Sequence, residues 1–280
     1  MSETQIDRSY TETTFQKTEG VAWRCFGAGE PMILLHGGAG SWLHWIKNID
    51  ALSQHFQVIA IDQPGYGDSD TVDWNLGIEE YLDLVHSAVD VIVGDAKWIH
   101  IAGFSFGGFI AADLARRFDH RCAALSMTGG AGYGRPEGRG FTLDSRRRMA
   151  ERLGRDPTSD EIWAMQKENL GKLMIWDEAK LDDWAVDMQV LNVARTRFDS
   201  RTLSWTDGTV DRVAELGCPV MVVYGEHDAA AIPPIPDRIA RIKTVHPDAR
   251  IEIIPDCGHW AMYEAPDVVN KLMIDFHKAA

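Results

Sequence analysis

A single serine among glycines, Ser105, is the residue of this chain best set for nucleophilic chemistry. It lies in the stretch HIAGFSFGGF, residues 100–109, where GFSFG fits the pattern G-x-S-x-G. An apolar run precedes the motif and an apolar-faced helical pattern follows it, the setting of a tight strand-to-helix turn that exposes the serine hydroxyl. The hydroxyl then lies at the positive end of the helix. We interpret the stretch as a nucleophile elbow rather than a chance match in a glycine-rich turn.

A serine hydroxyl needs a base, and the base needs a group that orients it. Asp228 follows the apolar run VMVVYG, and His259 follows the run RIEIIP. Both come just past the end of an expected strand, where open α/β sheets bind their ligands. The chain order Ser, Asp, His also goes with this elbow. We therefore predict a triad of Ser105, Asp228 and His259, with Glu226 as the reserve acid; His227 adjoins Asp228 and is expected to point away from it.

A second glycine-rich loop supplies the remaining part of an acyl-transfer site. The run LLHGGAGSW ends an apolar segment and opens a helical one. Backbone N–H groups there can stabilise a developing oxyanion, and we assign this role to the N–H groups of Gly38 and Phe106. Gly37 and Phe104 are expected at the wall of the substrate pocket. His36 is interpreted as a structural loop histidine.

Composition and charge exclude several classes of protein. The 280 residues carry a formal net charge of -14, which disfavours nucleic acid and anionic membranes as partners. Neither G-x-G-x-x-G nor a P-loop occurs, the ten histidines are dispersed, and no H-E-x-x-H is present, so we expect no cofactor and no metal. The N-terminal MSETQIDRSYTETT has no signal-type apolar core, and the four cysteines are scattered. These features predict a cytoplasmic protein with reduced thiols; a homo-oligomer is left open.

The strands and helices that must position these residues are predicted from short apolar runs that alternate with helical patterns. The expected strands are PMILLH, VIAID, WIHIAG, ALSMTG, VMVVYG and RIEIIP. This alternation predicts an α/β fold with a mostly parallel, eight-stranded sheet and helices on both faces. Antiparallel strands before Phe26 would add to its edge. The alternation stops between Tyr133 and Trp205, where we predict a helical lid, called the lid segment below (133–205), between two core parts, 1–132 and 206–280. Its helical stretches are SRRRMAERLG, SDEIWAMQKENLG with a cap at Thr158 or Ser159, and EAKLDDWAVDMQVLNVARTRF.

With these motifs in place, the chain resembles the α/β-hydrolase superfamily over its whole core. The resemblance is carried by HGGAGSW, IDQPGYGDSD, GFSFGG, YGEHD and CGHWAMYEAP. It implies that the loop from Asp62 to Ser69 and the pair Glu264 and Pro266 are largely structural. It also explains the glycines around Ser105, because the elbow admits nothing larger.

Within the superfamily, CGHWA is similar to the meta-cleavage-product hydrolases, which split carbon–carbon bonds in dienoic diketo acids. That resemblance implies a role for Trp260 and for a lid arginine that holds the substrate carboxylate, for which Arg195 and Arg197 are the candidates. The chain departs from that family at Phe104, where it usually has Asn, and in the oxyanion loop, where Gly-Pro-Gly is replaced by Gly38-Ala39-Gly40.

Three functions follow from this reasoning. The first is a serine hydrolase that forms an acyl-enzyme with a small-molecule carbonyl substrate, an ester, thioester or lactone. The second is a carbon–carbon bond hydrolase of the meta-cleavage type. The third is a ligand receptor on a hydrolase fold, since a fold alone does not fix a function.

Overall fold

The computed structural model describes residues 14–135, 137 and 140–280. Residues 1–13, with nearly all of the segment that lacks a signal-type core, lie outside the described residues, as do 136, 138 and 139 within the lid segment.

One large sheet organises the molecule, with eight strands in the order β1-β2-β4-β3-β5-β6-β7-β8. Their bounds are β1 Gln16–Thr18, β2 Val21–Phe26, β3 Pro31–Leu35, β4 Gln57–Asp62, β5 Ile99–Phe104, β6 Cys122–Thr128, β7 Val220–Gly225 and β8 Arg250–Ile254. At the edge, β2 pairs antiparallel with both β1 and β4, and the other neighbouring strands pair in parallel. The predicted α/β fold, its six apolar strands and its antiparallel edge are confirmed.

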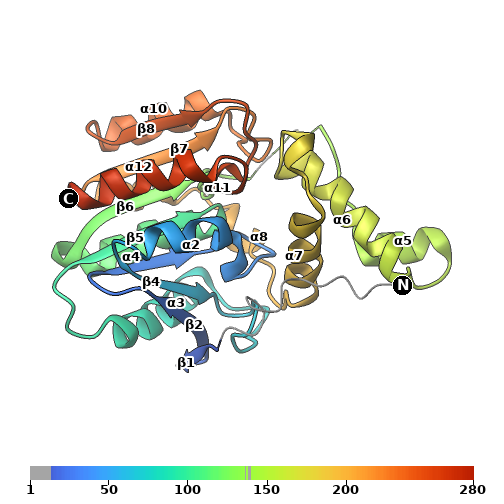
Figure 1. Cartoon of the computed structure of the whole chain (residues 1–280), viewed down its shortest axis with the longest axis horizontal. Coiled ribbons are helices and arrows are strands. Elements are labelled where there is room, and N and C mark those ends of the chain that lie inside the picture. Colours follow the sequence, from blue (N-terminus) through green and yellow to red (C-terminus); the bar gives the residue numbers. More distant parts are fainter. Residues whose placement is uncertain (1–13, 136, 138–139) are drawn as a thin grey trace.

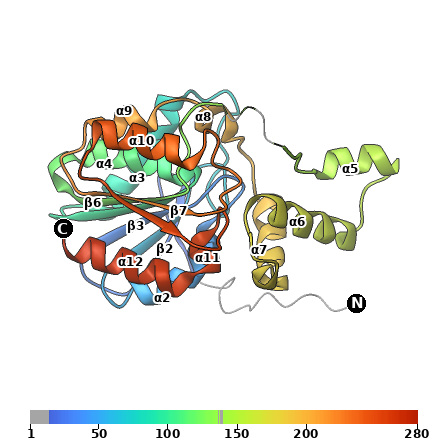
Figure 2. The ribbon, with the colours of Figure 1, turned by 90° about the horizontal axis from the view of Figure 1, so that it is seen from above.

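Helices cover both faces of the sheet (Figure 2). One face packs against α3 (Ile78–Val93), α4 (Phe106–Phe118), α9 (Thr209–Ala214) and α10 (Ile235–Val245). The other packs against α2 (Ile46–Leu52), α11 (Ala261–Glu264) and α12 (Pro266–Lys278). Short 3₁₀ turns at Trp42–Trp45 (η1) and Asp119–Arg121 (η2) precede α2 and β6. Burial of both faces explains why the parallel strands read as nearly continuous apolar runs.

The lid segment is helical and stands to one side of the sheet (Figure 1). It contains α5 (Arg146–Leu153), α6 (Ser159–Leu173), η3 (Glu178–Lys180), α7 (Asp183–Ala194) and α8 (Arg201–Ser204). Of the two expected caps, Thr158 is the one used: its hydroxyl accepts the Glu161 N–H, and the Glu161 carboxylate accepts the Thr158 N–H.

The last predicted lid helix differs from expectation. The stretch expected as one helix is interrupted at Asp182, which caps a new helix by accepting the Ala185 N–H at 2.8 Å. This helix, α7, ends at Ala194. Arg195 and Arg197 therefore lie in the loop beyond it, so helical geometry does not set their directions.

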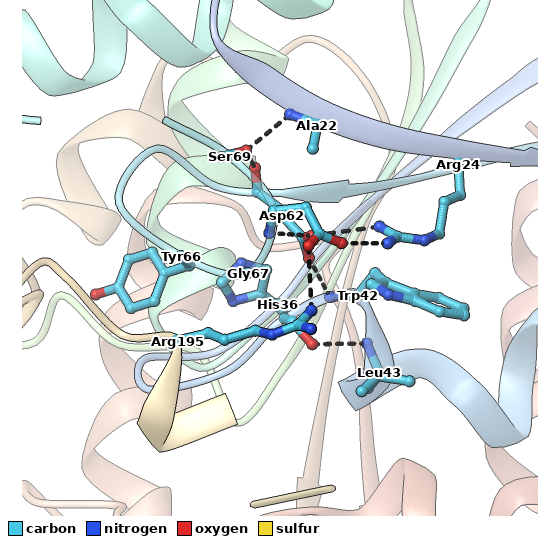
Figure 3. A network of polar contacts seen from close by, with 12 residues as sticks. Ala22, Arg24, His36, Trp42, Leu43, Asp62, Tyr66, Gly67, Ser69 and Arg195 are labelled. Carbon is cyan, nitrogen blue, oxygen red and sulfur yellow. Dashed lines mark hydrogen bonds and ion pairs between the residues drawn. The ribbon is translucent and has the colours of Figure 1, made fainter. Parts of the chain in front are cut away.

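A buried carboxylate, Asp62, ties the N-terminal strands to the loop that follows β3 (Figure 3). Its oxygens accept the Trp42 N–H at 2.8 Å, the Asp68 N–H at 3.0 Å and the Arg24 guanidinium at 3.2 Å. The Ser69 hydroxyl donates to the Asp62 carbonyl and accepts the Ala22 N–H. Because Trp42 lies just after the glycine-rich loop at residues 37–40, this network fixes the C-terminal end of that loop.

Two further observations bear on the sequence predictions. Cys25, Cys122, Cys218 and Cys257 are all free thiols. In the part of the chain that the structure describes, no helix combines the length and the apolar character needed to cross a membrane.

Candidate active site

Ser105 occupies a strained turn between β5 and α4. Its φ is 53° and its ψ is -115°, values that a residue with a side chain adopts only where its surroundings impose them. Its N–H donates to the Thr128 carbonyl, and its own carbonyl accepts N–H groups from Gly108 and Ala131, each at 2.9 Å. Backbone bonds to the end of β6 thus hold the elbow in place.

The glycines on either side of the serine leave no room for side chains. A Cβ on Gly103 would lie 2.2 Å from the Gly107 carbonyl oxygen, and one on Gly107 would lie 2.4 Å from the Leu35 carbonyl oxygen. The close approach of α4 to β3 and β5 therefore requires glycine at both positions.

The predicted base and acid lie beside each other. Nδ1 of His259 is 2.8 Å from Oδ1 of Asp228, and both side chains are almost fully buried. Asp228 Oδ1 also accepts the Ala230 N–H at 2.8 Å, which holds the carboxylate. The Phe104 ring packs against the imidazole at a centroid distance of 4.9 Å. The 2.8 Å contact is an ion-pair distance without hydrogen-bond alignment, and with Nδ1 beside the carboxylate, Nε2 is the ring atom left to accept a proton.

The rival groups of the same loop point elsewhere. The side chain of Glu226 is about half exposed and accepts the Asp256 N–H at 3.3 Å. His227 stacks on the lid residue Trp176 with ring centroids 3.9 Å apart. The ligand atoms of Glu226, His227 and Asp256 lie within 4.8 Å of one another, so these are the described residues that could hold a surface cation.

The expected oxyanion donors face the same cavity as Ser105. Gly38 and Phe106 both line it. The Phe106 N–H is the first of α4, where a helix offers no backbone acceptor. The hydroxyl of Ser200 lies so close to Gly38 that a Cβ there would be 2.6 Å from Oγ. The preceding Gly37 N–H is engaged, since it donates to Nδ1 of the buried His44 at 3.2 Å.

His36, at the end of β3, is a neutral structural imidazole. Its Nδ1 lies 2.7 Å from the Gly37 carbonyl, and its Nε2 accepts the Gln63 N–H at 2.9 Å. Complete burial lowers the pKa of His36 to about 4, although the nearby Asp62 opposes the shift. The His36 ring therefore links the start of the oxyanion loop, at Gly37, to the backbone of Gln63 after β4.

A cavity of about 520 Å³ lies above Ser105 and is lined by core and lid residues. The predicted wall residues Gly37 and Phe104 line it, together with Leu143, Leu173, Met174 and Val193 of the lid segment. A neighbouring cavity of about 560 Å³ lies beneath α6 and α7 and shares several of these residues. The site thus opens toward apolar space under the lid segment.

The structure does not bring the two candidate arginines to this cavity. Arg195 pairs with Asp68 at 3.1 Å and lies beside the Asp62 network (Figure 3). Arg197 donates to the carbonyls of Gly67 and Ser69, and its N–H to that of Gly65. Both side chains fasten the loop after β4 to the lid segment instead of facing Ser105.

Trp260 does not line the cavity either. Its side chain is fully buried, donates from Nε1 to the His44 carbonyl at 2.9 Å and stacks on Tyr263. Its N–H donates to the Met174 carbonyl of the lid segment at 2.7 Å. The tryptophan thus supports the loop of His259 from behind.

Glu264 joins the His259 loop to the lid segment. One carboxylate oxygen accepts the N–H groups of Trp176 and Asp177 at 3.0 and 2.9 Å, and the other accepts the Gly258 N–H at 2.6 Å. Burial raises the pKa of this carboxyl, and the three N–H groups and Lys180 oppose that shift. The structural role expected of Glu264 agrees with these contacts.

Two side chains beside the predicted triad were missed by sequence reasoning. Arg238 and Tyr133 line a smaller cavity of about 90 Å³ together with Ser105 and His259. Arg238 sits in DRIARIK, which has the pattern of an ordinary solvated helix, and Tyr133 sits at the start of the expected lid. A buried position for either residue has no signal in the local pattern.

Comparison with known proteins gives the following matches. Residues 32–272 match the model of the "Alpha/beta hydrolase family". A 2-hydroxy-6-oxononadienedioate/2-hydroxy-6-oxononatrienedioate hydrolase of Comamonas testosteroni is 28% identical over 265 residues, 89% of this chain and 88% of that protein.

Solved structures resemble the fold over most of both chains. A meta-cleavage product hydrolase from Pseudomonas fluorescens IP01 has a TM-score of 0.72 at 21% identity and covers 95% of this chain and 97% of its own. A "putative aryl esterase" from Burkholderia cenocepacia has a TM-score of 0.76 at 22% identity and covers 95% of this chain and 98% of its own. These likenesses agree with the sheet order and helix layers described above.

Proposed function

The chain belongs to the alpha/beta hydrolase family, and on that premise we propose that it is a serine hydrolase that forms an acyl-enzyme with a small carbonyl substrate. One observation carries the proposal: Ser105 is held in a strained elbow at a cavity that it shares with His259, whose Nδ1 lies 2.8 Å from the carboxylate of Asp228. A nucleophile, a base and an orienting acid are thereby close to one another.

In the acylation step, His259 Nε2 takes the proton of the Ser105 hydroxyl while Oγ attacks the carbonyl carbon. The Asp228 carboxylate stabilises the imidazolium that forms. The N–H groups of Gly38 and Phe106 donate to the oxyanion of the tetrahedral intermediate. When the intermediate collapses, the bond to the leaving group breaks and His259 returns its proton to that group.

Deacylation repeats the sequence with water as the nucleophile. His259 removes a proton from water, the hydroxide attacks the acyl carbon, and the same donors hold the second oxyanion. Collapse releases the acid and restores the Ser105 hydroxyl with the proton from His259. The lid segment, which contributes Leu143, Leu173 and Val193 to the cavity, covers the substrate in this proposal.

The decisive experiment pairs covalent labelling with turnover. A fluorophosphonate should label the wild type at Ser105, and Ser105→Ala should abolish labelling. The same variant should lower kcat for 4-nitrophenyl esters by roughly 10⁴ to 10⁶ without loss of unfolding free energy. A folded Ser105→Ala variant that keeps most of its turnover contradicts the proposal, as does a wild type that neither labels nor hydrolyses any ester.

A carbon–carbon bond hydrolase is the second candidate, favoured by the activity named for the Comamonas testosteroni relative. In this candidate function the same three residues, Ser105, Asp228 and His259, act on the carbon of a ketone. Against it, Arg195, Arg197 and Trp260 all lie away from the cavity, and Phe104 fills the position where an amide is usual. Turnover of a dienoic diketo acid, measured beside the ester panel, separates the two activities.

A further inference from the structure

A buried arginine without an acidic partner lies beside the catalytic pair. Arg238 projects from α10, is only 5% exposed, and lines the cavity of about 90 Å³ that also borders Ser105 and His259. Four of its N–H groups donate to the carbonyls of Gly130, Ala230, Ile232 and Pro233. A guanidinium has five N–H donors, so one has no carbonyl partner, and the guanidinium also lies near the Tyr224 hydroxyl.

Arg238 forms no ion pair within the described part of the chain. Nearby arginines are paired: Arg201 with Asp199, Arg212 with Asp113, and Arg241 with Asp207. Among the residues that the structure describes, no carboxylate forms an ion pair with Arg238, whose acceptors are all uncharged carbonyls. Burial of a cation without a counterion is costly, so the site attracts a negative group that enters it.

A buried tyrosine packs against this arginine at the cavity. Tyr133 is 4% exposed, and its ring centroid lies 4.8 Å from the guanidinium carbon of Arg238. Its hydroxyl lies near that of Tyr224, yet it makes no hydrogen bond of good geometry within the described part of the chain. Burial raises the pKa of Tyr133 well above its ordinary value, so the hydroxyl keeps its proton.

We infer that Arg238, beside the Tyr133 ring, forms a carboxylate subsite, so that the substrate is an acid whose carboxylate lies a few carbons from the scissile carbonyl. The inference rests on the proposed acyl-enzyme function. The subsite's volume of about 90 Å³ is that of about three waters at roughly 30 Å³ each, enough for a carboxylate on a short chain. The positive charge of a guanidinium and its remaining N–H suit a carboxylate oxygen as acceptor.

The first test compares two matched substrates, 4-nitrophenyl hydrogen glutarate and its methyl ester. The wild type should prefer the acid. Arg238→Met should lower the acid-to-ester ratio of kcat/KM by about 10- to 100-fold, as expected for a lost hydrogen bond and charge contact with a charged group. Tyr133→Phe should leave the ratio unchanged, because the Tyr133 hydroxyl is buried away from the cavity. The control is Arg241→Met, because Arg241 also lies against the Tyr133 ring but pairs with Asp207; it should leave the ratio unchanged.

Arg238 also clamps the loop after Asp228, so a structural effect must be separated from binding. Arg238→Lys keeps the charge but not the four carbonyl contacts. If the subsite exists, Lys retains part of the acid preference that Met loses. Equal losses on both substrates, with the same ratio in the Lys and Met variants, would assign Arg238 to the clamp alone and overturn the inference.

A binding measurement keeps the subsite distinct from the catalytic proposal. Glutarate should bind Ser105→Ala in a calorimetric titration, and the added Arg238→Met should weaken binding at least tenfold. Absence of glutarate binding, or equal binding with and without Arg238, refutes the subsite even if esters are hydrolysed. Conversely, binding that depends on Arg238 in a protein without esterase activity contradicts only the proposed acyl-enzyme.

Discussion

Acidification should destabilise the fold through His36, and the structure gives the size of the effect. Folded His36 has a pKa of about 4 because it is buried, whereas an unfolded histidine titrates near about 6.5. Between these values the unfolded chain binds more protons than the folded one, so stability falls as pH falls. At about pH 5 the unfolded imidazole is mostly protonated and the folded one is not, which amounts to about 2 kcal/mol relative to about pH 7.5.

The contacts of His36 explain the sign. Nε2 accepts the Gln63 N–H, and a proton on Nε2 would oppose that N–H and remove the bond. His44, His100 and His277 are also buried with lowered pKa values and add to the same trend. The total loss on acidification should therefore exceed the contribution of His36.

The assay is urea unfolding from about pH 5 to about pH 7.5 for the wild type and for His36→Gln. Glutamine keeps an acceptor for the Gln63 N–H but does not titrate, so its loss on acidification should be smaller by about 2 kcal/mol. His120→Gln is the control, because His120 is exposed. Parallel pH profiles for the wild type and His36→Gln refute the reasoning, and so does an imidazole NMR signal of His36 that titrates near its ordinary value.

Three other predictions concern the elbow, the acid and the lid loop. Asp228→Asn should lower kcat by about 10⁴ because it favours the wrong imidazole tautomer, whereas Glu226→Gln should have little effect; steady-state ester hydrolysis decides, and the reverse order would mean the wrong acid has been chosen. Gly107→Ala should reduce the unfolding free energy by at least about 2 kcal/mol, since its Cβ would meet the carbonyl of Leu35 at 2.4 Å; an unchanged urea midpoint would contradict the packing. Arg197→Met should lower the unfolding free energy and should reduce kcat/KM for acidic and neutral substrates alike. A reduction confined to the acidic substrate would instead indicate that Arg197 binds the substrate carboxylate.

The sequence was informative where a residue's place follows from the end of a strand. Ser105, Asp228 and His259 each follow an apolar run, and parallel strands end at one edge of the sheet, so their proximity could be predicted. The direction of a loop arginine could not be predicted. The helix α7 ends at Ala194, and Arg197 donates to carbonyls of the loop after β4, which is far away in the sequence.

Buried polar residues outside the motifs were equally hidden. Arg238 belongs to a helix whose pattern is that of a solvated surface, and its burial results from the loop that folds over α10 after Asp228. Propensity and periodicity report on one element at a time, whereas this position is created by two segments that meet in space.

The contacts of Glu264 with Trp176, Asp177 and Gly258 have a consequence for protein engineering. Residues 174–177 belong to the lid segment by sequence, yet their backbone hydrogen bonds hold the loop that carries His259. A chimera that replaces the whole lid segment by that of another hydrolase would therefore lose part of the scaffold of the proposed general base, His259. An exchange of substrate preference should keep residues 174–177 and replace the lid segment only before Met174 and beyond Asp177, so that the roof of the cavity changes while the loop of His259 keeps its hydrogen bonds.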